Sequence, residues 1–178
     1  MIDGHVHLWQ LGQHACSWPT PDLAGIYRDF VLDDLRAVLP PEVDGIVLVQ
    51  TQEEPADTEW LLELARDPLV RGVVGWADLT GTIPARADKL VGLRPMVQGR
   101  VADWYDSSEL QPGFAAMASN GLVLDALVRP AHLPALERLA RRHSDLAIVI
   151  DHAGKPVPGD TAEWAQAMQR LAALPTPR

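Results

Sequence analysis

Apolar runs separated by amphipathic segments make up most of this chain, and the runs predict strands. Residues 45–50 form a continuous run rich in β-branched side chains, a pattern typical of a strand that is buried on both faces. Shorter apolar runs recur along the rest of the chain. The predicted strands cover residues 2–8, 45–50, 70–79, 93–98, 121–128 and 146–150.

Segments with helical periodicity lie between these strands. Leu133, Leu136 and Leu139 recur every three residues, which places them on one side of a helix. The predicted helices cover residues 32–38, 56–66, 85–91, 109–119, 131–142 and 161–173. Six βα units therefore follow one another, which indicates an α/β protein with a parallel sheet.

This alternation is compatible with an open doubly wound sheet or with a barrel, and two observations favour the barrel. No glycine-rich phosphate-binding turn follows the first strand. Candidate chemical side chains instead follow the ends of several strands, where the active sites of (β/α)8 barrels are built. Such a barrel needs eight units and about 250 residues. The expectation is a single domain, 1–178, that forms an incomplete (β/α)8 barrel with about six of the eight βα units.

Composition and charge narrow the class of protein. Hydrophobic residues make up 47% and charged residues 22% of the chain, and the net charge is −9. An acidic balance argues against a nucleic-acid partner and against an anionic membrane surface. The single cysteine, Cys16, suits a reducing compartment. Because the first residues leave no room for a signal sequence and no apolar run is long enough to span a membrane, we expect a cytoplasmic protein.

Two histidines near the start of the chain are the first candidates for chemistry. His5 and His7 are two residues apart on the first predicted strand, so their side chains point to the same face. Two imidazoles on one face can bind a metal ion or polarise a carbonyl group. The motif alone is equally compatible with two histidines that serve only packing and hydrogen bonding.

Four motifs in a fixed order give a more specific indication. They are Asp-Gly-His-Val-His-Leu-Trp at 3–9, Gly-Leu-Arg-Pro-Met-Val-Gln at 92–98, Leu-Asp-Ala-Leu-Val-Arg-Pro at 124–130 and Asp-His-Ala-Gly-Lys-Pro at 151–156. This succession resembles the amidohydrolase-related (amidohydrolase 2) proteins, and within them the branch of sugar-lactone and dicarboxylate lactonases. The resemblance extends from residue 2 to about residue 174, and it implies an amidohydrolase-type distorted barrel.

The resemblance implies hydrolysis of a small-molecule lactone by attack of water on the ester carbonyl. The catalytic histidines of the family fall on His5, His7 and His152. In members that use a metal, the same three histidines would bind zinc, whereas other members need no metal. The resemblance also favours a functional role for His5 and His7 over packing alone.

Arg94, Gln98 and Arg129 are the predicted substrate-binding residues. Arg94 and Gln98 have the same parity on the predicted fourth strand, so both should face the barrel interior. A guanidinium group there can hold a carboxylate or a lactone carbonyl, although a structural ion pair is the alternative role for Arg94. Asp125 shares the parity of Arg129, and its carboxylate is expected either to orient a histidine or to bond Arg129.

The chain departs from the family pattern at its C-terminal end. The resemblance implies a proton-accepting aspartate at the end of the eighth strand, in a Ser-Asp-Trp-Pro-like stretch, and no aspartate of this sequence matches it. We therefore expect a truncated barrel, with strand edges that invite self-association. Two alternatives follow: an inactive fragment that retains at most ligand or metal binding, and a metal-dependent decarboxylase of the same superfamily.

Overall fold

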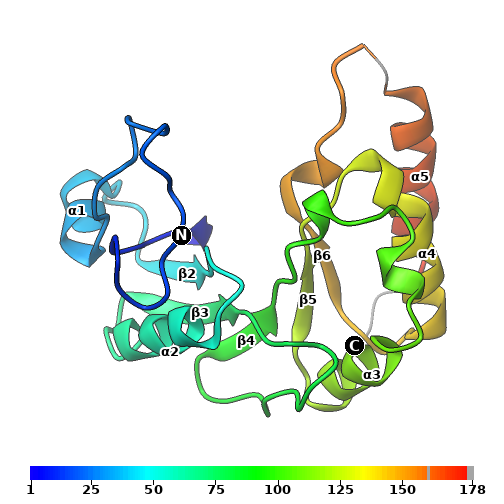
Figure 1. Ribbon diagram of the computed structural model, residues 1–178, viewed down its shortest axis with the longest axis horizontal. Coiled ribbons are helices and arrows are strands. Elements are labelled where there is room, and N and C mark those ends of the chain that lie inside the picture. Colours follow the sequence, from blue (N-terminus) through cyan, green and yellow to red (C-terminus); the bar gives the residue numbers. More distant parts are fainter. Residues whose placement is uncertain (160, 176–178) are drawn as a thin grey trace. The chain divides into compact units, whose positions relative to one another are not determined.

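A computed structural model describes residues 1–159 and 161–175 (Figure 1). The chain forms two compact units. The first contains residues 1–77 and 87–92, and the second contains residues 78–86 and the chain from residue 93 onward. Each unit has its own strands, helices and buried core.

The first unit contains parallel strands in chain order, with two helices. Residue Ile2 lies opposite Gly45, and Val47 lies opposite Gly72, so the first three strands pair in sequence. Side chains of the central strand, Ile46 and Leu48, are fully buried, as the apolar run predicts. The elements are β1 (Ile2–Val6), α1 (Leu32–Val38), β2 (Gly45–Val49), α2 (Pro55–Leu64), β3 (Val70–Gly75) and β4 (Leu90–Leu93).

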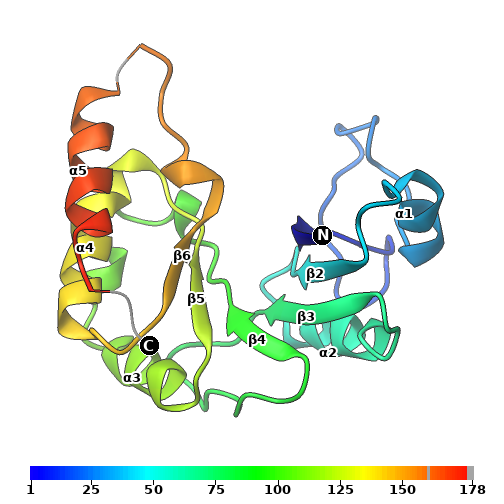
Figure 2. The ribbon, with the colours of Figure 1, turned by 180° about the vertical axis from the view of Figure 1, so that it is seen from behind.

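In the second unit, two parallel strands are accompanied by three helices. Leu124 lies opposite Ile148, and α4 packs against α5 (Figure 2). Leu133, Leu136 and Leu139 are fully buried, which confirms the predicted apolar side of α4. The elements are α3 (Gln111–Ser119), β5 (Val123–Ala126), α4 (Leu133–Arg142), β6 (Ile148–Ile150) and α5 (Ala162–Ala172), with 3-10 turns η1 (Val97–Gly99), η2 (Trp104–Asp106), η3 (Pro130–His132) and η4 (Asp151–Gly154).

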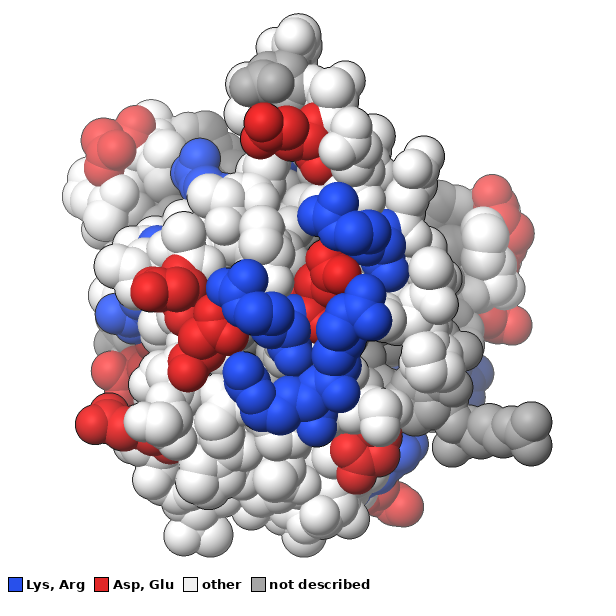
Figure 3. All heavy atoms as spheres, turned by 90° about the vertical axis from the view of Figure 1, so that its right-hand side faces the viewer, with Lys and Arg blue, Asp and Glu red and all other residues white. Residues whose placement is uncertain are grey.

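Charged side chains on the helices of the second unit are paired with one another. Arg141 and Arg170 both contact Glu137, at 2.7 and 2.8 Å, and Arg138 contacts Asp106 at 2.5 Å. Figure 3 shows basic and acidic side chains interleaved on this side of the molecule. Exposed pairs of this kind contribute about 0–1 kcal/mol each, so they order the surface more than they stabilise the fold.

The segment between β3 and β4 differs from the prediction. No helix forms over residues 85–91, where one was expected, and residues 90–93 form β4 instead. The backbone N–H of Val73 donates to the carbonyl of Lys89 at 2.7 Å, and Val91 packs over Gly72, which has no side chain to obstruct it. Pairing with β3 therefore prevails over the local helical preference.

Several strands are also shorter than predicted. β1 ends at Val6 rather than at residue 8, because the chain turns and Trp9 exchanges backbone hydrogen bonds of 3.0 Å with Phe30. β4 begins earlier than the predicted fourth strand and ends at Leu93, two residues before Pro95. Proline has no N–H group to donate to a strand ladder, so the predicted strand cannot continue through it.

Candidate active site

The two histidines at the end of β1 face each other in the first unit. Their Nε2 atoms are 3.2 Å apart, and the ring planes are nearly perpendicular, at 89°. His7 Nδ1 is 2.8 Å from the carbonyl oxygen of Val49 at the end of β2. Because a carbonyl only accepts hydrogen bonds, this contact places the proton of neutral His7 on Nδ1. The lone pair of Nε2 is then directed towards His5.

This geometry fits two ligands of a zinc ion. With Zn–N distances of about 2.0–2.1 Å in a tetrahedral site, two ligand nitrogens lie roughly 3.3 Å apart, close to the observed separation. Metal-binding histidines also usually donate their second N–H group to a carbonyl or a carboxylate, as His7 does to Val49. The two histidine nitrogens, together with the Val49 carbonyl that holds the His7 ring, are therefore suited to a metal ion.

A buried ion pair lies in the second unit, where Arg94 contacts Asp151. The distance from Arg94 Nη1 to Asp151 Oδ2 is 3.4 Å, and the two side chains are 4% and 2% exposed. This contact confirms the ion pair that the sequence left open for Arg94. The prediction that Arg94 and Gln98 face the same side of one regular strand is wrong. Arg94 follows the end of β4, and Gln98 lies in η1.

Asp125 on β5 lies close enough to this ion pair for its charge to be affected. Burial, followed by the charge of Asp151, raises the pKa of Asp125 to about 7, while Arg94 acts in the opposite direction. The Asp125 carboxyl accepts no hydrogen bond from any described residue, so the expected bond to Arg129 is not formed. Burial without hydrogen bonds disfavours the charged form of a carboxyl group, so its protonated form is favoured.

His152 stands in a strained turn that directly follows β6. Its backbone is left-handed, with φ 51° and ψ 34°, and Ala153 and Lys155 are also left-handed, with φ of 53° and 51°. Each such residue other than glycine costs about 1–2 kcal/mol, and strain of this kind concentrates at functional sites. The backbone N–H of Lys155 donates to the carbonyl of His152 at 3.0 Å and closes the turn.

Gln98, Arg129 and Lys155 meet at the same place in the second unit. The Nε atom of Arg129 donates to the backbone carbonyl of Gln98 at 3.1 Å, and the ammonium group of Lys155 donates to the side-chain oxygen of Gln98. Gln98 lies in η1 and Arg129 just after β5, so neither is on a strand. Lys155 was not among the predicted site residues, although it belongs to the motif at 151–156.

Tyr105 in η2 is a further buried polar residue that sequence reasoning did not select. Its side chain is fully buried, and its hydroxyl group has no hydrogen-bond partner in the described part of the chain. Burial raises the pKa of Tyr105 well above its usual range, and the charge of Asp151 adds to this effect. A single tyrosine in a polar segment, between Trp104 and Asp106, gives no sequence signal that it will be buried.

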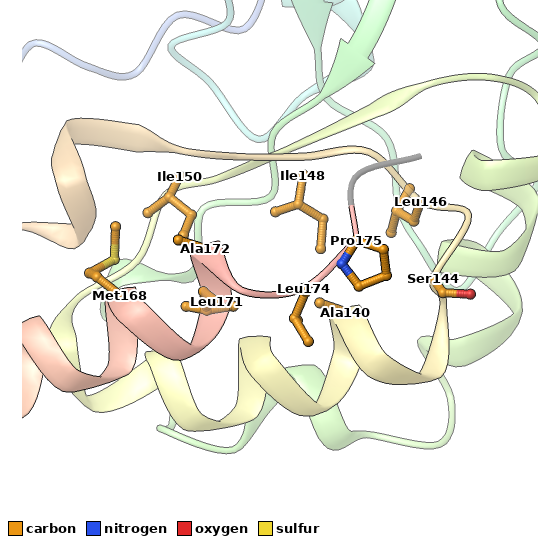
Figure 4. Close-up of a pocket in the computed structure, with 10 residues that line it drawn as sticks. All are labelled: Ala140, Ser144, Leu146, Ile148, Ile150, Met168, Leu171, Ala172, Leu174 and Pro175. Atoms are coloured by element: carbon orange, nitrogen blue, oxygen red, sulfur yellow. The ribbon is translucent and has the colours of Figure 1, made fainter. Parts of the chain in front are cut away.

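An apolar pocket of about 250 Å³ lies between α4, α5 and β6. In Figure 4, Ile148 and Ile150 from β6 face Met168 and Leu171 from α5. None of the ten residues that line it has an ionisable side chain. Ionisable side chains are therefore found among the polar residues described above and not in this pocket. Separately, no helix among the described residues is long and apolar enough to span a membrane.

Comparison with known proteins finds one matching family and two relatives with the same name. The sequence matches the amidohydrolase family over residues 2–176. It is 44% identical to an L-fucono-1,5-lactonase of Burkholderia ambifaria and 32% identical to one of Burkholderia multivorans, covering 98% of this chain in both cases. The chain spans 64% of the length of each of these two relatives.

A solved relative supports the fold. The structure of an amidohydrolase from Burkholderia multivorans, determined with bound zinc, superposes with a TM-score of 0.87 at 31% identity and covers 98% of this chain and 66% of that one. The architecture is thus that of an incomplete amidohydrolase-type (β/α)8 barrel, with about six of the eight βα units.

Proposed function

The chain belongs to the amidohydrolase family, and we propose that it acts on a lactone, adding water to the ester carbonyl and opening the ring. The observation that carries this proposal is the pair of imidazoles at His5 and His7, with Nε2 atoms 3.2 Å apart. The names of the two Burkholderia relatives favour a lactone over the substrate of a decarboxylase.

The histidine pair would bind a zinc ion. When bound, zinc supplies polarisation of the ester carbonyl and a lower pKa for a coordinated water molecule. The contribution of the chain is to hold the His7 ring through Val49, so that Nε2 is unprotonated and available. His152 is the third histidine of the predicted set, and its strained backbone after β6 supports a functional role.

Substrate recognition is assigned to Gln98 and Arg129. Both side chains are accessible to solvent, and Arg129 carries a planar set of N–H donors suited to a carbonyl or carboxylate. Arg94 is 3% exposed and paired with Asp151, so we assign it to holding this carboxylate next to His152 rather than to gripping the lactone. Of the predicted substrate-binding residues, Gln98 and Arg129 therefore keep that role in this proposal, and Arg94 is given a positioning role instead.

The reaction is a simple hydrolysis. The oxygen of water forms a bond to the carbonyl carbon, the ring C–O bond breaks, and the leaving oxygen takes up a proton as the hydroxyl group of the product. The carboxylic acid that results releases a proton to the solvent at neutral pH. Ring opening is therefore detectable as acidification.

A pH-indicator assay on L-fucono-1,5-lactone and a panel of other aldonolactones tests the proposal. The expected result is ring opening faster than the uncatalysed rate with at least one lactone, and a rate reduced to background in His152→Ala. A wild-type chain that binds zinc or lactone but opens no lactone would favour the alternative of a binding protein without turnover. Carbon dioxide release from an aromatic or muconate-type acid would favour the decarboxylase.

A further inference from the structure

Two positively charged side chains meet at one glutamine, and each donates to an uncharged oxygen of that residue. Lys155 donates to the side-chain oxygen of Gln98, and Arg129 donates to its backbone carbonyl at 3.1 Å. Neither Lys155 nor Arg129 forms an ion pair with any described residue. Both acceptors on Gln98 are uncharged, so the two positive charges are not neutralised there.

Elsewhere among the described residues, several cations pair with a carboxylate and others stand singly against a backbone carbonyl, as Arg71, Arg86 and Lys89 do. The sequence has 24 acidic and 15 basic residues, so carboxylates are abundant. Many arginines use them: Arg28 pairs with Asp34, Arg138 with Asp106, and Arg170 with Glu137. In an acidic protein, two neighbouring cations that have only amide oxygens as partners point to a negative charge supplied from outside the chain.

The positive charges lie close enough to affect one another. Partial burial and then the charges of Arg129 and Arg94 lower the pKa of the Lys155 ammonium group, while the charge of Asp151 acts in the opposite direction. A second charged group would normally be avoided at such a place, since like charges repel. An anion between them removes the repulsion and gains charge-assisted hydrogen bonds.

Hydrogen-bond donors remain available at this place. Arg129 uses its Nε atom for Gln98, so its two terminal nitrogens have no partner among the described residues. Lys155 uses one of the three hydrogens of its ammonium group on Gln98. Arg129 is exposed and Lys155 is half-buried, so a small anion can reach both.

The left-handed turn fixes Lys155 in this position. Its backbone has φ 51° and ψ 61°, and its N–H group is bonded to the carbonyl of His152. Gly154, the residue before it, also has a positive φ, of 69°. The turn therefore carries His152 and Lys155 on one short, closed piece of backbone.

We propose that Gln98, Arg129 and Lys155 form an anion-binding subsite that takes a carboxylate, namely that of the hydroxy acid released when a lactone is opened. The choice of this acid rests on the proposed function, whereas the anion subsite itself rests only on the contacts above. Arg129 offers two parallel N–H donors to the two carboxylate oxygens, and Lys155 adds a positive charge from the side of Gln98.

The experiment measures binding of D-gluconate, an aldonate, by isothermal titration calorimetry, with D-glucitol as the uncharged counterpart. We expect gluconate to bind, glucitol not to bind, and the gluconate affinity to fall as salt is raised. Lys155→Met should lower the affinity for gluconate at least about tenfold, as expected for the loss of a hydrogen bond between charged groups. Lys155→Arg should retain most of the affinity.

The sequence provides a matched control, because it contains only two lysines. The second, Lys89, donates to the carbonyl of Val70 at 2.8 Å in the first unit, and Lys89→Met should leave gluconate binding unchanged. Circular dichroism of each variant shows whether it is folded. Equal affinity for gluconate and glucitol, or equal weakening by the two lysine variants, would overturn the subsite. Failure of lactone turnover with intact gluconate binding would instead count against the proposed function alone.

Discussion

Replacement of Asp125 by asparagine should stabilise the protein at high pH, although it removes a charged group. Asparagine has nearly the same shape as aspartate but cannot ionise. The buried Asp125 carboxyl accepts no hydrogen bond from a described residue and lies near the negative charge of Asp151. Its ionised form is therefore unfavourable in the folded chain.

The magnitude follows from the pKa of Asp125. The difference between a pKa of about 7 in the folded chain and 3.8 in the unfolded chain corresponds to roughly 4 kcal/mol. Between these two values the unfolded chain has lost the proton and the folded chain still holds it, so the free energy of unfolding falls as the pH rises. Below this range both states are protonated, and above it both are ionised and the full loss is present.

Urea unfolding of the wild-type chain and Asp125→Asn between pH 4 and pH 9 measures this difference. The two proteins should have similar stability near pH 4, and the variant should be more stable by up to about 4 kcal/mol near pH 9. Other titrating groups are common to both proteins and cancel. A difference in stability that stays constant over this range would show that the buried Asp125 carboxyl is not destabilising, as would an Asp125 carboxyl that ionises near pH 4 in a ¹³C NMR titration of the folded chain.

Two other predictions concern metal binding and packing. Protein purified with zinc should contain about one ion per chain by mass spectrometry. His5→Ala and His7→Ala should each contain well below one ion, because each variant lacks one ligand of the pair. Equal zinc content in all three proteins would count against the site. Gly113→Ala should lower the free energy of unfolding by roughly 2 kcal/mol or more, since the added Cβ would lie 2.2 Å from the backbone oxygen of Leu79. Gly99→Ala, with no atom within 4 Å of its Cβ, is the control and should unfold like the wild type.

Much of the fold could be predicted from hydrophobic periodicity. The helix at 32–38 and the buried strand that begins at residue 45 are where the pattern places them. The helix predicted at 85–91 does not form, because residues 90–93 pair beside β3, a segment distant in sequence. Local preference carries no information about such a partner.

The candidate site was predicted in part. The alternation of side chains brought His5 and His7 together correctly, even though His7 lies just beyond the end of β1. The supporting carbonyl of Val49 could not be predicted, because it depends on the register of two strands. Likewise, the contact between Lys155 and Gln98 follows a left-handed turn, and no sequence pattern predicts that turn.

The central claim is that the histidine pair serves the opening of a lactone. The most direct test is the initial rate of acid release from L-fucono-1,5-lactone, measured with zinc present for the wild-type chain, His7→Ala and a blank without protein. We expect a wild-type rate above the blank and a loss of about 10²-fold or more in His7→Ala. A wild-type rate equal to the blank, or an undiminished rate in His7→Ala, would contradict it.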